Sequence, residues 1–266
     1  MMQHLAHLTL ASTLCLSACY AMAQDYAREA RLAQEVVSGL VVGDAVQIKA
    51  SSGREFLGLY TPGKAGTSAI VLVHGVGVHP DFGVIGLLRA KLSDLGYTTL
   101  SIQMPVQSKE AKVDDYFPPV FPDAADRMAK AADWLRAKGH AKTVLLSHSM
   151  GAWMANEYLD TAHAATPYQA WIVLGLTGGY SWGMRRYALP ILDVYGELDN
   201  APVLGAVGRR KFALQETNGS RQVKIEGGDH NYTGRENAVA AAIDAFLGDR
   251  DYHLAKLVEA GGVYPR

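Results

Sequence analysis

The sequence has very little cysteine, only Cys15 and Cys19 among its 266 residues. Both lie within residues 1–24, so the rest of the chain has no cysteine and no disulfide can hold its fold together. Residues 1–24 also lack charge, because none of the 25 Lys and Arg or 26 Asp and Glu side chains occurs there. The net charge of the whole chain is −1 and no basic stripe is present. This composition argues against nucleic acid as a partner.

The uncharged beginning predicts an export signal. Its apolar core, residues 5–18, is too short to span a bilayer, and residues 21–23 (AMA) form a small-x-small cleavage site. We therefore expect a signal peptide at residues 1–23 and a periplasmic or secreted protein, although the usual positive charge near the start is missing. An alternative stays open. Residues 16–19 (LSAC) resemble a bacterial lipobox, and the protein would be a membrane-anchored lipoprotein only if Cys19 is lipidated.

The remaining residues, 24–266, have the length of one α/β domain. Short apolar runs alternate with helical runs, which include residues 82–95, 123–138 and 236–247. Such alternation predicts a mostly parallel central sheet with helices on both faces.

Residues 143–151 (TVLLSHSMG) are the most informative stretch of the chain. An apolar strand runs directly into a small-x-Ser-x-Gly sequence that opens a helix. This pattern predicts a tight turn that exposes the Ser149 hydroxyl, with the Met150 backbone N–H directed at an oxyanion. Ser147 replaces the glycine that usually begins the pattern. Taken alone, the stretch also suits a strand followed by a serine-capped helix.

A second turn follows the apolar strand at residues 69–73. Its sequence, HGVGVHP at residues 74–80, combines a histidine with flexible glycines. We expect the Val76 backbone N–H to be a second oxyanion donor and His74 to brace the turn.

Two later strands end in a candidate acid and a candidate base. Asp199 follows a strand and a glycine turn, and His230 lies in the loop after residues 222–226. The order Ser149, Asp199, His230 is the one expected of an α/β-hydrolase triad, with each residue at the sheet edge where such sites form. Other interpretations remain: Asp199 caps a helix, His230 is a solvated loop residue, or another carboxylate is the acid. The rival carboxylates are Asp193, Glu197 and Asp229. We favour a structural role for Asp193, which lies inside a strand, and interpret the other two as turn residues.

These segments together resemble the α/β-hydrolase superfamily, and most closely a proteobacterial family of exported proteins of unknown function. The similarity is carried by residues 71–81 (VLVHGVGVHPD), 98–105 (TTLSIQMP) and 145–152 (LLSHSMGA). The resemblance implies an α/β-hydrolase fold and a serine hydrolase mechanism, but no particular substrate.

Two loops are expected to shape substrate specificity. Residues 105–122 carry four prolines and several aromatic side chains, which predicts a lid or pocket wall, or alternatively a stiff surface crossover. Residues 178–187 lie where many hydrolases insert a cap, and their small number predicts a minimal cap and an open site. The expected substrate contacts are Tyr116, Phe117, Trp182 and Arg185. Arg185 either binds an anionic substrate or is a solvated surface charge.

No cofactor or metal is expected. The histidines form no ligand pair at helical spacing, and residues 75–77 (GVG) lack the third glycine of a dinucleotide site. The sequence thus predicts an exported serine hydrolase, acting on a small-molecule or envelope-derived carboxylic ester. The alternatives are an amidase or peptidase, an acyltransferase, or a noncatalytic envelope binding protein that kept the fold. No oligomeric state is predicted.

Overall fold

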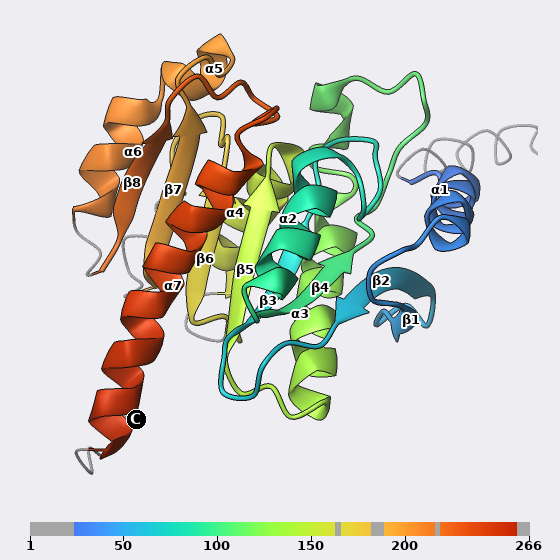
Figure 1. Cartoon of the computed structure of the whole chain (residues 1–266). Coiled ribbons are helices and arrows are strands. Elements are labelled where there is room, and N and C mark those ends of the chain that lie inside the picture. The colour runs from blue at the N-terminus through green and yellow to red at the C-terminus, as the bar shows by residue number, and fades with distance from the viewer. Residues whose placement is uncertain (1–23, 163–165, 182–188, 216–218, 260–266) are drawn as a thin grey trace, which may run out of the picture.

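A computed structural model describes residues 24–162, 166–181, 189–215 and 219–259, the last eleven of these as backbone only. Its centre is an eight-stranded sheet of order β1-β2-β4-β3-β5-β6-β7-β8 (Figure 1). Strand β2 runs antiparallel to both of its neighbours, while all other neighbours are parallel. The mostly parallel sheet predicted from the sequence is confirmed. The strands are β1 (Asp44–Lys49), β2 (Glu55–Thr61), β3 (Ala69–Val73), β4 (Thr98–Ile102), β5 (Thr143–His148), β6 (Ala170–Leu174), β7 (Ile191–Gly196) and β8 (Arg221–Ile225).

Helices cover both faces of the sheet, as predicted. Helices α2 and α7 lie on one face, where they surround one apolar cluster, and α3 and α4 lie on the other (Figure 1). Side chains of β3 alternate between the two clusters, as the two-residue period of a strand requires. The described helices are α1 (Tyr26–Ser38), α2 (Gly83–Asp94), the 3-10 turn η1 (Val113–Tyr116), α3 (Phe121–Ala137), α4 (Met150–Ala162), α5 (Ala201–Leu204), α6 (Val207–Leu214) and α7 (Glu236–Glu259).

Helix α1 lies beside the β1 and β2 end of the sheet (Figure 1). Its Val36 is buried against Leu57 and Leu59 of β2, in a small apolar cluster separate from the two main ones. Asp25 caps the helix, because its side chain accepts a hydrogen bond from the Arg28 backbone N–H. Within the described residues, none of the helices is long and apolar enough to cross a membrane.

The parallel strands place six connections at one edge of the sheet. All strands from β3 to β8 point the same way, so the loops that follow them meet at their carboxyl ends. The connection from β6 to β7, where a minimal cap was predicted, occupies only residues 175–190, of which residues 182–188 lie outside the described part.

Candidate active site

Ser149 lies in a strained turn between β5 and α4. Its φ angle is 56°, a left-handed value that residues other than glycine rarely adopt. The turn is held because the Ser149 N–H donates to the Leu174 carbonyl at 3.1 Å, while the Ser149 carbonyl accepts from the N–H groups of Ala152 and Trp153. Such strain is kept only where the surroundings fix the backbone, and it is common at functional sites.

The small residues around Ser149 are explained by close packing. A side chain at Gly151 would collide with the carbonyl oxygen of His74, and one at Gly75 would lie 3.4 Å from the Ser149 Cβ. Ser147 is completely buried, and its Oγ accepts a hydrogen bond from Trp171 Nε1 at 2.8 Å. The serine that replaces the usual glycine therefore has a partner of its own in β6.

Three of the predicted residues meet in one hydrogen-bonded chain. His230 Nδ1 lies 2.6 Å from Asp199 Oδ1, and His230 Nε2 lies 2.9 Å from Ser149 Oγ. Because a carboxylate only accepts, the imidazole proton belongs on Nδ1 and the Nε2 lone pair faces the Ser149 hydroxyl. The Asp199 side chain is fully buried, and the backbone N–H of Asn200 also donates to it, at 2.8 Å. The arrangement can take a proton from the Ser149 hydroxyl.

The loop that presents His230 is fixed from several sides. Burial lowers the pKa of His148 to about 4, so this ring is neutral, and its Nε2–H donates to the His230 carbonyl at 2.8 Å. Tyr232 adopts a φ of 55°, and its hydroxyl donates to the Val194 carbonyl at 2.9 Å. Gly175 passes so close that a Cβ there would lie 3.0 Å from the His230 Cε1. His148 thus holds the loop that carries His230.

The rival carboxylates have other partners. Asp193 pairs with Arg210 at 2.9 Å, and both side chains have no exposed surface. Glu197 accepts from the Gly227 N–H at 2.9 Å. Asp229 accepts from the N–H groups of Asn231 and Thr233 within its own turn.

The proposal that Asp199 itself caps the following helix is wrong. Asn200 is the N-cap of α5, and its side chain accepts from the Val203 N–H at 3.2 Å.

The turn at residues 74–80, which we call the oxyanion turn, is ordered by His74. The Met104 N–H donates to His74 Nε2 at 2.9 Å, so the ring proton is on Nδ1, which donates to the Gly75 carbonyl at 2.8 Å. Burial lowers the pKa of His74 to about 3, which keeps the ring neutral. In a trans peptide the N–H points opposite to the C=O. The bond to the Gly75 carbonyl therefore fixes the direction of the Val76 N–H.

Val76 and Ser149 line the same pocket, which has a volume of about 150 Å³. Met150 is the first residue of α4, so its N–H belongs to the first helical turn and has no acceptor within the helix. His230 closes one side of the pocket, and most of the remaining wall is apolar, with Val78, Phe82, Val84 and Ile85.

A second cleft of about 290 Å³ lies along α4. Phe117, which was predicted to contact substrate, lines it together with Phe121 and Trp153. The Trp153 ring is fixed because its Nε1–H donates to the Thr177 carbonyl at 3.0 Å. Trp153 was not named from the sequence, although its place one helical turn after Ser149 was a usable signal.

The other predicted substrate contacts are placed differently. Tyr116 is only 1% exposed and belongs to the apolar core, where its hydroxyl accepts from the Gln107 N–H at 3.1 Å. It lines neither pocket. Trp182 and Arg185 lie outside the described residues. Among the side chains that the structure describes, no group of three His, Cys, Asp or Glu is arranged to hold a metal ion.

Comparisons with known proteins identify the family of the chain. Residues 70–261 match the alpha/beta hydrolase family, and residues 7–119 match a family described as a protein of unknown function, DUF3530. A comparison with curated proteins finds no match.

Several solved structures have a similar fold. XC6422 from Xanthomonas campestris, described as an α/β serine hydrolase without a lid, is 16% identical over 79% of this chain and 95% of its own, with a TM-score of 0.59. Est1E from Butyrivibrio proteoclasticus with bound ferulic acid is 14% identical over 77% and 98%, and dienelactone hydrolase from Anabaena variabilis is 20% identical over 77% and 96%, both with TM-scores of 0.59. These structures share the fold, and the family match over residues 70–261 shows that the chain belongs to the alpha/beta hydrolase family.

Proposed function

We propose that the protein is an exported serine hydrolase that cleaves carboxylic esters. Ser149 is the nucleophile, His230 the general base and acid, and Asp199 the residue that orients His230. The observation that carries the proposal is the position of the imidazole, 2.6 Å from the carboxylate and 2.9 Å from the hydroxyl. Both distances are short enough for proton transfer without rearrangement.

The reaction has two halves. Ser149 Oγ attacks the ester carbonyl carbon while its proton passes to His230 Nε2, and the Asp199 carboxylate stabilises the resulting imidazolium. The bond to the alcohol oxygen then breaks, the alcohol leaves with the proton from His230, and the acyl group stays on Ser149. Water repeats the attack with His230 again as base, which releases the carboxylic acid and restores the hydroxyl.

The negative charge that develops on the carbonyl oxygen needs donors. The N–H groups of Val76 and Met150 are suited to this role by their places on the oxyanion turn and at the start of α4. One such donor is worth about 3–4 kcal/mol of transition-state stabilisation.

The pocket beside Ser149 supports a short acyl group. An apolar cavity of about 150 Å³, the volume found here, holds a benzene-sized molecule. The aromatic cleft that contains Phe117 and Trp153 is available for the rest of a small-molecule or envelope-derived substrate. Est1E with ferulic acid and dienelactone hydrolase make carboxylic esters a reasonable substrate class for this fold.

Export rests on the first 23 residues, which we propose to be a signal peptide. Gln24 and Asp25 would then begin the mature chain, and both contact the folded domain: Gln24 Nε2 donates to Glu29 at 2.6 Å and the Asp25 N–H donates to the Val106 carbonyl at 2.7 Å. Intact-mass measurement of the exported protein tests this. A mass equal to that of residues 24–266 supports cleavage before Gln24. A mass that includes a lipidated Cys19 would identify the protein as a lipoprotein.

Hydrolysis of p-nitrophenyl esters of increasing acyl length tests the proposed function. We expect turnover that favours short acyl groups, disappears in Ser149→Ala and persists in a control variant of an exposed serine, Ser52→Ala. Brief incubation should add the mass of the acyl group to the wild-type protein. Cleavage of amides but not esters, or transfer to an added alcohol in preference to water, would contradict the ester hydrolase and identify one of the related reactions.

A further inference from the structure

The amino-terminal helix α1 reaches the oxyanion turn through one side chain. Arg28 Nη2 donates to the Gly77 carbonyl at 2.7 Å, and Arg28 Nη1 donates to the Gln107 carbonyl at 2.7 Å and to the Ser108 carbonyl at 3.4 Å. The guanidinium therefore joins three segments that are far apart in the sequence. Helix α1 also precedes residues 70–261, which match the hydrolase family, so this contact comes from outside that match.

Arg28 is itself held in place. The Asp25 side chain accepts from the Arg28 N–H at 2.8 Å, and the Asp25 N–H donates to the Val106 carbonyl at 2.7 Å. Gly77 adopts a φ of 67°, and a Cβ there would lie 3.3 Å from Arg28 Nη2. The turn and the guanidinium are thus packed against each other as well as hydrogen-bonded.

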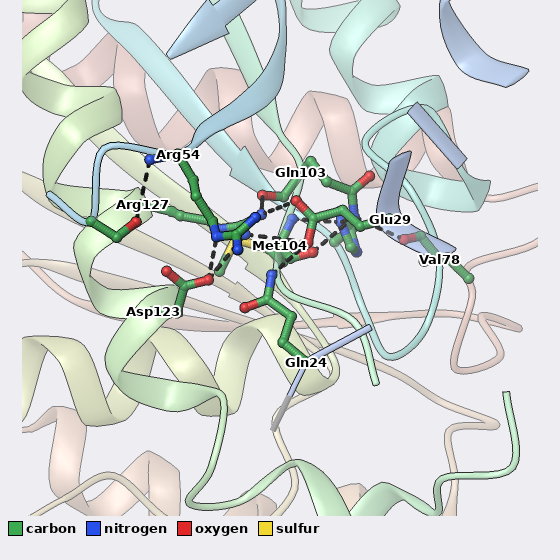
Figure 2. A network of polar contacts seen from close by, with 10 residues as sticks. Gln24, Glu29, Arg54, Val78, Gln103, Met104, Asp123 and Arg127 are labelled. Carbon is green, nitrogen blue, oxygen red and sulfur yellow. Dashed lines mark hydrogen bonds and ion pairs between the residues drawn. The ribbon is translucent and has the colours of Figure 1, made fainter. Parts of the chain in front are cut away.

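A second connection runs from α1 to the same turn through buried groups (Figure 2). Glu29 pairs with Arg127 at 2.7 Å, with side chains 9% and 4% exposed, and Arg127 donates to the Gln103 carbonyl at 2.9 Å. The Gln103 side chain then donates to the Val78 carbonyl at 3.3 Å. Two neighbouring residues of α1 therefore lead to two neighbouring carbonyls of the oxyanion turn.

These bonds fix the peptide planes next to the nucleophile. Three carbonyls close to Val76 accept from side chains: Gly75 from His74, Gly77 from Arg28 and Val78 from Gln103. Because each carbonyl fixes the opposed N–H of its own peptide, the Gly75 carbonyl fixes the Val76 N–H, and the Gly77 and Val78 carbonyls fix the two peptides that follow Gly77. The Val76–Gly77 peptide is therefore held between fixed peptides on both sides. A carbonyl bound to a cation holds its direction more strongly than one bound to a neutral donor.

We infer that Arg28 is a positioning residue, which holds the oxyanion turn so that the Val76 N–H is directed at the reacting carbonyl oxygen. This inference rests on the proposed ester hydrolysis. It makes α1 part of the catalytic apparatus. The arginine fork binds the Gly77 and Gln107 carbonyls together, whereas the single ammonium of a lysine is a point charge on a flexible stem.

The test compares Arg28→Ala and Arg28→Lys with Arg31→Ala, a control that removes an exposed arginine from the same helix. In Arg28→Ala we expect kcat for a short p-nitrophenyl ester to fall about 10- to 100-fold while KM changes less than about twofold. Arg28→Lys should lie between this variant and the wild type, and Arg31→Ala should match the wild type. Millimolar guanidinium should restore part of kcat to Arg28→Ala only.

Hydrogen exchange gives a second readout that needs no activity. Amides of residues 76–78 should exchange faster in Arg28→Ala than in the wild type, while those of β5 stay unchanged. Unchanged kcat or unchanged exchange in Arg28→Ala would overturn the inference, as would a loss of kcat that guanidinium does not relieve. Failure of the proposed function is seen separately, as absence of turnover in the wild-type protein, and would remove the inference with it.

Discussion

The serine that departs from the usual glycine at the nucleophile turn leads to a quantitative prediction. Ser147 and Trp171 have no exposed surface, and Trp171 Nε1–H donates to Ser147 Oγ at 2.8 Å. Removing the hydroxyl leaves a buried N–H without this acceptor, which costs about 1–3 kcal/mol. Glycine in place of serine adds about 0.5–1 kcal/mol through the greater freedom of the unfolded chain.

We therefore expect Ser147→Ala to lower the free energy of unfolding by about 1–3 kcal/mol, and Ser147→Gly by somewhat more. Ser147→Gly thus restores the residue that usually begins the pattern, yet it lowers the stability of the protein. Urea unfolding, followed by fluorescence and circular dichroism, measures it, with kcat as a check that Ser149 is undisturbed.

Trp171→Phe provides the matching control, because phenylalanine has no N–H to satisfy. In a double-mutant cycle, Ser147→Ala should cost less in the Trp171→Phe background than in the wild type, with a coupling energy of about 1 kcal/mol or more. If Ser147→Gly is as stable as the wild type, or more stable, the assigned role of the serine is refuted.

Substitutions of His148, Asp199, Asp193 and Phe82 also have distinct expected outcomes. Burial lowers the pKa of His148 to about 4 from the usual value of 6.5, so the unfolded chain takes up a proton first, and the contribution of His148 to stability should fall by up to about 3 kcal/mol as pH drops from 6.5 toward 4. His74, whose pKa burial lowers to about 3, adds to the fall. Urea unfolding at several pH values should show a shallower fall in His148→Gln, and an unchanged fall would contradict the prediction. Asp199→Asn should lower kcat about 10⁴-fold with little loss of stability. Asp193→Asn should instead lower stability by about 3–5 kcal/mol, because it breaks a buried ion pair. If kcat falls in Asp193→Asn and the urea midpoint falls in Asp199→Asn, Asp193 is the acid. Phe82→Trp, which enlarges a side chain of the pocket beside Ser149, should lower kcat/KM for hexanoate relative to acetate esters about tenfold, and an unchanged ratio would place the acyl group elsewhere.

Local sequence was sufficient to find Ser149, Asp199 and His230 as candidates that the fold brings together. Each follows an apolar strand, and parallel strands end at the same edge, so their order and positions predicted proximity. The roles of the carboxylates were harder to separate. Only the three-dimensional partners distinguish Asp199, which contacts His230, from Asp193, which contacts Arg210.

The walls of the site and the contribution of α1 were not predictable in this way. Tyr116 belongs to an aromatic, proline-rich loop, and nothing in its sequence shows that its ring is buried while that of Phe117 is 48% exposed. Arg28 acts across 49 positions on Gly77, a contact that no local pattern encodes. Such contacts depend on how α1 packs against the β2 end of the sheet.

A fluorophosphonate probe tests whether Ser149 is an activated nucleophile. These reagents react with a serine only when a base and an oxyanion site assist it. Peptide mass spectrometry of the treated protein should locate one adduct at Ser149, absent from Ser149→Ala and strongly reduced in His230→Ala. A folded wild-type protein without an adduct, or with an adduct on another serine, would show that Ser149 is not the activated nucleophile.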